Sequence, residues 1–315
     1  MRHFFKSSIL VLATVFLTQS CSKDDNEVDM SGETYNTTFK ITDAPIDNAN
    51  VEGVFVTLAD VRVDGRSLDG FSRTTVNLAA LVNGQTETLG SLDLAARSYS
   101  SLELVLDYDT DAQGNAPGCY VALANGAKDK LTAQSDRISV SDAFEVFGRA
   151  TNEVVLDFDL RKTIMEEQGT LESDFEFVSM SELSAGIRTV NEESTGRISG
   201  IANDSQNTSD RIVVYAYEKG TFDAETETRG QGESDVTFKN AVTSSVVNAN
   251  SGSYTLSFLE EGEYELVFAS YNRDGDKFFF NALLEAESTT GLNLGSISVT
   301  SALQISANVT ITGTR

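Results

Sequence analysis

The chain has 315 residues, 40% of them hydrophobic, and its 48 acidic side chains outnumber 23 basic ones, which gives a formal net charge of -25. This balance argues against nucleic acid as a partner, because binding nucleic acid needs a basic surface that displaces counterions from phosphates. An acidic surface favours solubility, cations and basic partners. The hydrophobic content lies above that of disordered chains, and the length allows two hydrophobic cores.

The first 20 residues have the pattern of a signal peptide. Arg2 and Lys6 precede the apolar run 9–17, which has the length of a signal-peptide core. The run is too short to cross a bilayer as a helix, since crossing takes about 20 apolar residues. We therefore expect residues 1–20 to be removed from the mature protein.

The residues that end this segment resemble the lipobox of bacterial lipoproteins. Leu17 stands four residues before Cys21, and the small Ser20 directly precedes the cysteine. The resemblance implies that the Cys21 thiol carries a diacylglyceryl group and that the new amino end is acylated. Several acyl chains hold a protein firmly in a bilayer, whereas a single chain binds only marginally. An ordinary secretory signal with an incidental cysteine is the alternative.

Residues 21–33 are polar and acidic and have no hydrophobic periodicity, which predicts a flexible tether. The start of this segment resembles the export signal that sends lipoproteins of the Bacteroidetes group to the outer face of the outer membrane; its residues are Ser22, Lys23, Asp24 and Asp25. We therefore expect an outer-membrane lipoprotein that is anchored by its N-terminal lipid and faces the cell exterior. The alternative is a merely polar tether.

Histidine and cysteine usage restricts the possible chemistry. The only histidine, His3, lies in the predicted signal peptide, so the mature chain lacks the usual base of Ser-His-Asp and Cys-His catalysis and the commonest zinc ligand. With Cys21 lipidated, Cys119 has no disulfide partner and no histidine to activate it. We interpret Cys119 as a small apolar residue at a strand start. The sequence therefore predicts a non-enzymatic protein that requires no cofactor.

Residues 34–188 contain short stretches of alternating apolar and polar residues separated by Gly, Asn and Asp, a pattern typical of a β-sandwich. A short helix is expected over 160–167, with Asp159 as its N-cap, and a second near 78–82. The expected strands cover 38–43, 54–58, 74–78, 87–92, 99–106, 120–123, 138–140, 143–147, 153–159, 175–178 and 182–187.

Three blocks in this region resemble a bacterial lipoprotein family, the domain of unknown function 4382. They cover residues 39–45, 92–107 and 154–162, and the similarity extends over about 35–188. The family usually has a glycine where Arg97 or its neighbour stands, so the turn there should differ. The family has no established activity, and the resemblance therefore implies a domain but no catalytic residues.

Residues 189–195 lose the alternation and gain charge, so we expect a linker there. Beyond it, 196–315 contain further strands, an acidic loop over 222–235, and a hairpin of 253–258 and 263–268. The hairpin resembles the prealbumin-like or carboxypeptidase-regulatory-like β-sandwich, whose hallmark is Gly-x-Tyr-x-Leu, a short turn with Gly, and Tyr-x-Leu. The expected fold class is therefore all-β, with two β-sandwich domains in tandem behind the signal peptide and the tether.

The strongest candidate site is an acidic stretch after the strand 99–106. Its carboxylates lie two residues apart and could wrap oxygen ligands around Ca²⁺; the candidate ligands are Asp107, Asp109, Asp111 and Asn115. The stretch departs from an EF-hand loop, which has Gly where Ala112 stands and a bidentate Glu further on. The alternative is that these acids only continue the solvent face of the strand into a loop.

Two other groups invite a functional reading. Asp157 and Asp159 flank Phe158 and could form the carboxylate pair of a glycoside hydrolase. However, the alternation points Phe158 into the core and places both acids beside Arg161, which favours salt bridging and helix capping. Aromatic side chains could stack on sugars, although strand aromatics usually lie in cores or cross-strand pairs; these are Tyr215, Tyr217, Tyr271, Phe278, Phe279 and Phe280.

The sequence as a whole predicts a non-enzymatic surface lipoprotein that binds glycan or protein ligands as a binding or adhesion module. The first alternative is an accessory subunit that docks to an outer-membrane transport or polysaccharide-utilisation complex. The second is a hydrolase that uses only carboxylates.

Overall fold

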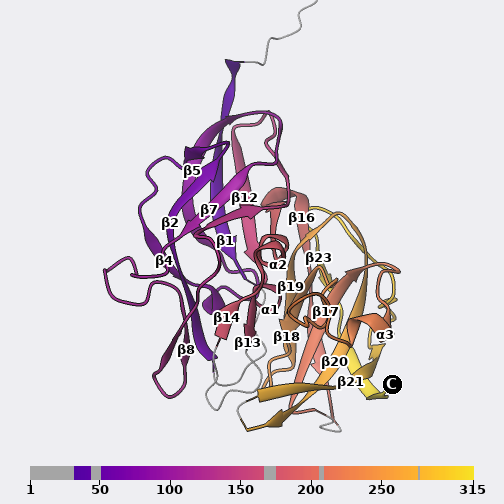
Figure 1. Ribbon diagram of the computed structural model, residues 1–315. Helices are drawn as coiled ribbons and strands as arrows, with labels where there is room; N and C mark the ends of the chain where they lie inside the picture. Colours follow the sequence, from indigo (N-terminus) through magenta and orange to yellow (C-terminus); the bar gives the residue numbers. More distant parts are fainter. Residues whose placement is uncertain (1–31, 44–50, 167–174, 206–208, 276) are drawn as a thin grey trace, which may run out of the picture.

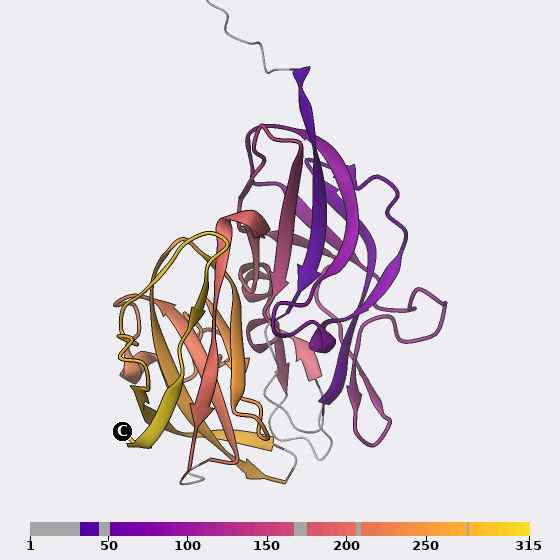
Figure 2. The same cartoon turned by 180° about the vertical axis from the view of Figure 1, so that it is seen from behind.

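The computed structural model shows two β-domains, and the second packs beside the half of the first that lies away from the start of β1 (Thr34–Thr42; Figures 1 and 2). The start of β1 and the C-terminus lie at opposite ends of the molecule. The predicted fold class, all-β with two β-domains in tandem, is confirmed. The residues that the structure describes are 32–43, 51–166, 175–205, 209–275 and 277–315.

Two sheets make up most of the first domain. The smaller sheet has the strand order β15-β12-β1-β5, and its strands are β1 (Thr34–Thr42), β5 (Glu87–Ala95), β12 (Thr151–Phe158) and β15 (Ile187–Asn191). In the larger sheet five strands follow the order β10-β7-β2-β8-β9, and two short ones pair with β2. Its strands are β2 (Val51–Val63), β3 (Arg66–Ser67), β4 (Thr74–Asn77), β7 (Leu102–Leu106), β8 (Tyr120–Leu123), β9 (Lys128–Lys130) and β10 (Arg137–Val140).

Short elements connect these strands. Two small pairs are β6 (Ser98–Tyr99) with β11 (Phe144–Glu145) and β13 (Ile164–Glu166) with β14 (Phe175–Phe177). The helical turns are η2 (Leu78–Ala80), α1 (Leu160–Thr163) and α2 (Met180–Ala185). Within the described part of the chain, no helix is long and apolar enough to cross a membrane.

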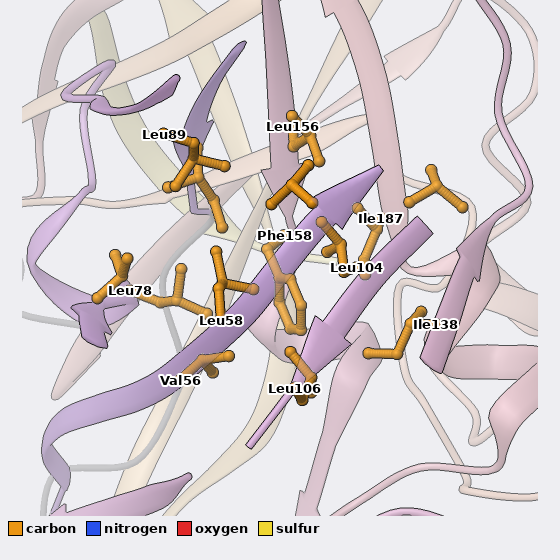
Figure 3. Packing of buried hydrophobic residues seen from close by; sticks show 14 of the residues in the cluster. Val56, Leu58, Leu78, Leu89, Leu104, Leu106, Ile138, Leu156, Phe158 and Ile187 are labelled. Atoms are coloured by element: carbon orange, nitrogen blue, oxygen red, sulfur yellow. The ribbon is translucent and has the colours of Figure 1, made fainter. Parts of the chain in front are cut away.

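Apolar residues that alternate along the strands build the core between the two sheets. Val56 and Leu58 of β2 and Leu104 of β7 are fully buried. They meet Phe158 of β12, which comes from the other sheet (Figure 3). Burying each such side chain stabilises the fold by roughly 1.5–3 kcal/mol relative to leaving it exposed, so this core joins the two sheets.

The second domain is a nine-stranded sheet that bends until its two ends meet. Seven strands follow the order β18-β17-β20-β21-β24-β16-β19, while β22 pairs with β20 and β23 with β16. The amide of Asn248, after β18, donates to the carbonyl of Ser253 at the start of β19 (2.8 Å). The strands are β16 (Thr195–Asn203), β17 (Arg211–Glu218), β18 (Thr243–Val246), β19 (Ser253–Glu260), β20 (Gly262–Asp274), β21 (Lys277–Ser288), β22 (Ile297–Val299), β23 (Gln304–Ser306) and β24 (Val309–Thr314).

Apolar side chains pack on both faces of this sheet. Leu256 and Phe268 belong to the inner core. On the outer face the segment 222–241, which includes α3 (Ala224–Glu227), covers the sheet. Its Phe238 stacks on Tyr215 of β17 with ring centroids 4.2 Å apart, and both rings are buried. The predicted acidic loop is therefore a cover with its own aromatic core.

The connection between the domains is shorter than the predicted linker over 189–195. Strand β15 continues to Asn191, because Thr189 and Val190 pair with β12 and are buried. Strand β16 begins at Thr195, and only the turn η3 (Glu192–Ser194) separates the two. The charges that suggested a linker are those of this turn.

Two other predicted elements also differ. The helix predicted over 160–167 ends at Thr163, because Ile164–Glu166 pairs with β14 as a strand. The strand predicted over 182–187 is wrong for most of its length: Met180–Ala185 forms α2, and only residue 187 enters β15. Leu183 is the buried residue of that helix, and a single turn carries too few apolar residues to reveal a helical period.

Candidate functional site

Asp107 in the acidic stretch is held by its own loop. One of its carboxylate oxygens accepts the amides of Asp109 (2.9 Å) and Thr110 (3.0 Å), and the other pairs with the Arg73 guanidinium at 2.9 Å. Burial raises the pKa of Asp107, but the amide hydrogen bonds and Arg73 outweigh it and keep the pKa below its ordinary value. The loop therefore uses this carboxylate to form a turn.

The other candidate calcium ligands are engaged in the same way. Oδ1 of Asp111 accepts the amides of Gln113 (2.9 Å) and Asn115 (2.8 Å), and the Asn115 side-chain amide donates to Oδ2 at 3.1 Å. The hydrogen bond from the Asn115 amide is the main reason why the pKa of Asp111 is lowered. Asp109 points to solvent and pairs with Lys130 at 2.8 Å.

These bonds direct the three acids to different partners. Among the described residues there is no group of three or more His, Cys, Asp or Glu side chains that could hold a metal ion. The structure thus places the predicted ligands on one loop but gives each carboxylate a protein partner, and calcium binding there stays a prediction.

Asp157 and Asp159 lie at the end of β12 and are buried rather than solvent-facing. Asp157 pairs with Arg188 of β15 at 2.7 Å, and Asp159 pairs with Arg161 at 2.7 Å and with Lys162 at 3.4 Å. Asp159 also accepts the Arg161 amide (3.1 Å) as the N-cap of α1. The predicted salt bridging and capping are confirmed, whereas Arg188 as a partner was not foreseen, because it is distant in sequence.

The cations of these pairs also bind the second domain. Arg161 donates to the carbonyl of Phe238 (3.4 Å), Lys162 to that of Ala241 (2.7 Å), and Arg188 to that of Phe258 (2.9 Å). We call the surface through which the two domains touch the domain contact. It consists of these three cations and their carbonyl partners, of Glu182 with the segment 233–239, and of the turn at Asn83 and Gly84 with β18 and β19. Burial lowers the pKa of the Lys162 ammonium, although the Asp159 charge opposes this.

Both phenylalanines whose carbonyls accept a hydrogen bond from an arginine have strained backbones. The φ angles of Phe238 and Phe258 are 51° and 56°, a left-handed conformation that is unusual for a bulky residue and costs on the order of 1–3 kcal/mol. This conformation occurs where the carbonyls of Phe238 and Phe258 meet Arg161 and Arg188. Phe258 also packs against Val155 and Val190 of the first domain.

Glu182 of α2 adds a second polar connection. Its Oε1 accepts the amide of Glu233 (3.0 Å) and the ammonium of Lys239 (3.2 Å), and its Oε2 accepts the hydroxyl of Ser234 (2.6 Å). Burial raises the pKa of Glu182, but the hydrogen bonds from Ser234 and Lys239 outweigh it and lower the pKa. The cover segment 222–241 is thus bound to the first domain as well as to its own sheet.

A tight turn of the first domain completes the domain contact. Asn83 and Gly84 have φ angles of 59° and 82°, and the hydroxyl of Ser245 in β18 donates to the Asn83 side chain at 3.4 Å. A Cβ atom on Gly84 would lie 2.6 Å from Oγ of Ser257 in β19. The turn therefore reaches the place where the two end strands of the second sheet meet, and only glycine fits there.

Asp43 is the remaining buried acid beside this contact. Its Oδ1 accepts the amide of Leu160 at 3.1 Å, while its Oδ2 has no hydrogen-bond partner within the described structure. Burial and the charge of Asp159 raise the pKa of Asp43 well above its ordinary value, although the Leu160 amide opposes them. This environment favours the protonated acid.

The remaining sequence candidates are mostly buried. Cys119 is inaccessible, and burial raises the pKa of its thiol to about 12, which agrees with its interpretation as an apolar core residue. The three tyrosines considered for sugar stacking are also buried, and of the Phe278–Phe280 run only Phe279 is exposed, at 51%. The predicted lipid site, Cys21, and the predicted export signal, residues 22–25, lie outside the described residues. The export signal comprises Ser22, Lys23, Asp24 and Asp25.

Comparisons with solved structures give low overall similarity. The Bacillus anthracis TIE protein is 10% identical with a TM-score of 0.19, and the alignment covers 88% of this chain and 34% of that one. A leucine-rich repeat protein from Bacteroides thetaiotaomicron is 11% identical with a TM-score of 0.23, covering 89% and 26%. The major pilin subunit BcpA of Bacillus cereus is 10% identical with a TM-score of 0.20, covering 89% and 71%.

The chain thus spans about a third and a quarter of the first two of these proteins, and TM-scores this low support no conclusion about function. No curated protein matches the chain. A family model does match: the domain of unknown function DUF4382 covers residues 36–173. The resemblance expected from the three sequence blocks is therefore confirmed for most of the first domain.

Proposed function

We propose that the protein is a non-enzymatic lipoprotein of the outer membrane that faces the cell exterior and binds glycan or protein ligands. The observation that carries this proposal is that the Asp157 and Asp159 carboxylates are both engaged in ion pairs. Hydrolysis of a glycosidic bond needs one carboxyl group as acid and another as base or nucleophile. Here each acid is paired with an arginine and buried at the domain contact.

The anchor part of the proposal rests on the sequence around Cys21. An apolar run, a leucine four residues before the cysteine and an acidic segment after it make up the pattern of an exported lipoprotein. Several acyl chains on one cysteine would hold the chain permanently at the membrane. The first domain would then lie next to the membrane and the second further from it, because β1 starts at the end of the first domain that lies away from the second (Figure 1).

We assign ligand contact to the second domain. Three large apolar side chains are exposed within the described part of the chain, Ile201, Phe279 and Leu303, at 51%, 51% and 43%, and all three belong to this domain. An aromatic face that water can reach is available to a sugar ring or to an apolar side chain of a partner. Phe279 is the exposed aromatic residue among them.

The binding test uses the mature chain 21–315 without lipid on glycan arrays and on surface proteins from labelled cells. We expect a saturable ligand whose binding falls at least about tenfold, or 1.4 kcal/mol, in Phe279→Ser. The control variant Phe55→Ser changes a partly exposed aromatic residue of the first domain and should bind normally. Recovery of one membrane protein in fixed ratio would support the docking alternative instead, and absence of any ligand would contradict the proposal.

The anchor is tested separately by metabolic labelling with palmitate and by protease treatment of intact cells. Labelling should be lost in Cys21→Ser, and the native protein should be digested from outside. A chain that is labelled but survives while other surface proteins are lost would contradict exposure at the exterior. Turnover of a glycoside panel that disappears in Asp157→Asn or Asp159→Asn would contradict the non-enzymatic role.

A further inference from the structure

Strand β1 is the first strand of the described residues, and it lies inside its sheet rather than at an edge. It pairs in parallel with β12 from residue 36 to 42 and antiparallel with β5 from residue 34 to 41. Phe39 and Ile41 of this strand are fully buried. The strand that leads to the predicted anchor is therefore held on both sides and by the core.

The second domain is attached to the neighbours of β1, not to β1 itself. Strand β12 continues into α1, whose Arg161 and Lys162 bind carbonyls of the second domain. Strand β15, which pairs with β12, carries Arg188 and continues through η3 into β16. A pull on the second domain therefore reaches the strands beside β1, and it must cross the pairing of β1 with these neighbours to reach the anchor.

One side chain bridges this pairing directly. Lys40 of β1 pairs with Glu153 of β12 at 2.9 Å and with Glu192 of the turn between the domains at 2.7 Å. The Lys40 side chain is only 16% exposed. Burial alone would lower its pKa, but the two glutamates outweigh burial and raise it, so the lysine stays charged.

We infer that β1 is a mechanical clamp, which keeps the first domain folded when force acts between the membrane anchor and a ligand held by the second domain. The clamp consists of β1, its pairing with β5 and β12, and Lys40. Ladder hydrogen bonds run across the strands, and β1 runs lengthwise through the first domain, away from the end at which it starts (Figure 2). A pull along β1 therefore loads many bonds together instead of one after another. This inference rests on the proposed anchored binding function.

The test is single-molecule pulling on the mature chain 21–315 without lipid. One handle is attached at the Cys21 thiol and the other at Arg315→Cys, so that force runs along β1. In the comparison the second handle is at Ala95→Cys, because Ala95 is the strand partner of Thr34 and force then peels β1 from β5 at one end. The buried Cys119 thiol does not compete for the handles.

We expect the first domain, identified by the length of chain that it releases, to open at a force about twofold or more higher along β1 than in the peeling geometry. The reason is that forced opening follows the unfolding rate, and peeling lets the bonds break singly. Equal forces in the two geometries, or a lower force along β1, would overturn the inference.

A pair of side-chain variants sharpens this test. Lys40→Met should lower the opening force of the first domain along β1. Lys219→Met removes an exposed pair of the second domain, with Glu263 at 2.8 Å, and should leave that force unchanged. An unchanged force in Lys40→Met would remove Lys40 from the clamp. No ligand enters these measurements, so a failed clamp is distinguishable from a failed binding proposal.

Discussion

The acidic loop around Asp107 and the acids at the end of β12 are similar in sequence but differ in what they hold. Asp107 and Asp111 accept amides within a few residues and fix a local turn. Asp157 and Asp159 pair with arginines that also bind the second domain. The difference is that one acidic group stabilises a loop, whereas the other stabilises the arrangement of two domains.

The largest expected effect comes from removing the arginine that pairs with each acidic group. Arg161→Met leaves the buried Asp159 with the more distant Lys162, at 3.4 Å, as its cation, and removing one partner of a buried pair costs about 3 kcal/mol or more. Arg73→Met removes the half-exposed partner of Asp107, and such pairs contribute about 0–1 kcal/mol. Urea unfolding of both variants measures the difference. Similar losses would show that burial does not separate the two acidic groups.

A smaller loss of stability is expected from changes in the Asn83–Gly84 turn, which contacts β18 and β19 of the second domain. Gly84→Ala places a methyl group 2.6 Å from Oγ and 3.2 Å from Cβ of Ser257. Gly126→Ala has a similar positive φ of 85° but meets no atom within 4 Å. We expect Gly126→Ala to cost about 1 kcal/mol for the backbone alone, and Gly84→Ala about 1 kcal/mol more for the clash. Equal melting temperatures would mean that the turn does not fit tightly against β19.

The third prediction concerns pH and Asp43. Burial, followed by the Asp159 charge, raises the pKa of Asp43 in the folded state. The folded protein then binds this proton more tightly than the unfolded chain, so its stability falls as pH rises above the ordinary carboxyl pKa of about 3.9 toward the folded pKa. Asp43→Asn stays neutral at every pH. The difference between its melting temperature and that of the native protein should therefore shift in favour of the variant as pH increases.

The measurement compares melting temperatures of the two proteins from about pH 4 to about pH 8. Gly126→Ala changes no titratable group and meets no atom within 4 Å, so it should run parallel to the native protein over this range. If Asp43→Asn also runs parallel, Asp43 is ionised in the fold and its second oxygen has a partner in solution.

The smallest expected effect concerns calcium at the acidic loop. A ligand that binds only the folded state raises the melting temperature. Because Asp107 and Asp111 already accept amides and Asp109 pairs with Lys130, we expect millimolar Ca²⁺ to leave the melting temperature of the mature chain unchanged. A rise that disappears in Asp111→Asn would establish the calcium site.

Strand positions were predictable where burial follows a period of two. Residues 102–106 alternate clearly and form a strand inside the predicted range 99–106. Strand β12 also lies close to its predicted range 153–159, although residues 154–158 are all buried. The N-cap at Asp159 was also predictable, since capping depends on neighbours in sequence. Short helices such as Met180–Ala185 were not, because one turn contains too few residues for a helical period.

The domain contact could not be predicted, because its partners are far apart in the chain. Arg188 meets Phe258, and Glu182 meets Lys239, and no spacing rule relates these positions. The positive φ angles of Phe238 and Phe258 also give no sequence signal, since glycine or asparagine would be expected in that conformation. Such contacts depend on how the two folded domains pack against each other.

The parallel pairing of β1 with β12 also sets the order in which the chain can fold. A chain is synthesised from its N-terminal end, so β1 is made before its parallel partner β12, and β2 to β11 are made between them. Parallel pairing between distant segments is slow to form, and an unpaired strand edge can associate with other chains. The β12-facing edge of β1 therefore stays unpaired until most of the first domain has been made, although β5 can pair with the other edge earlier.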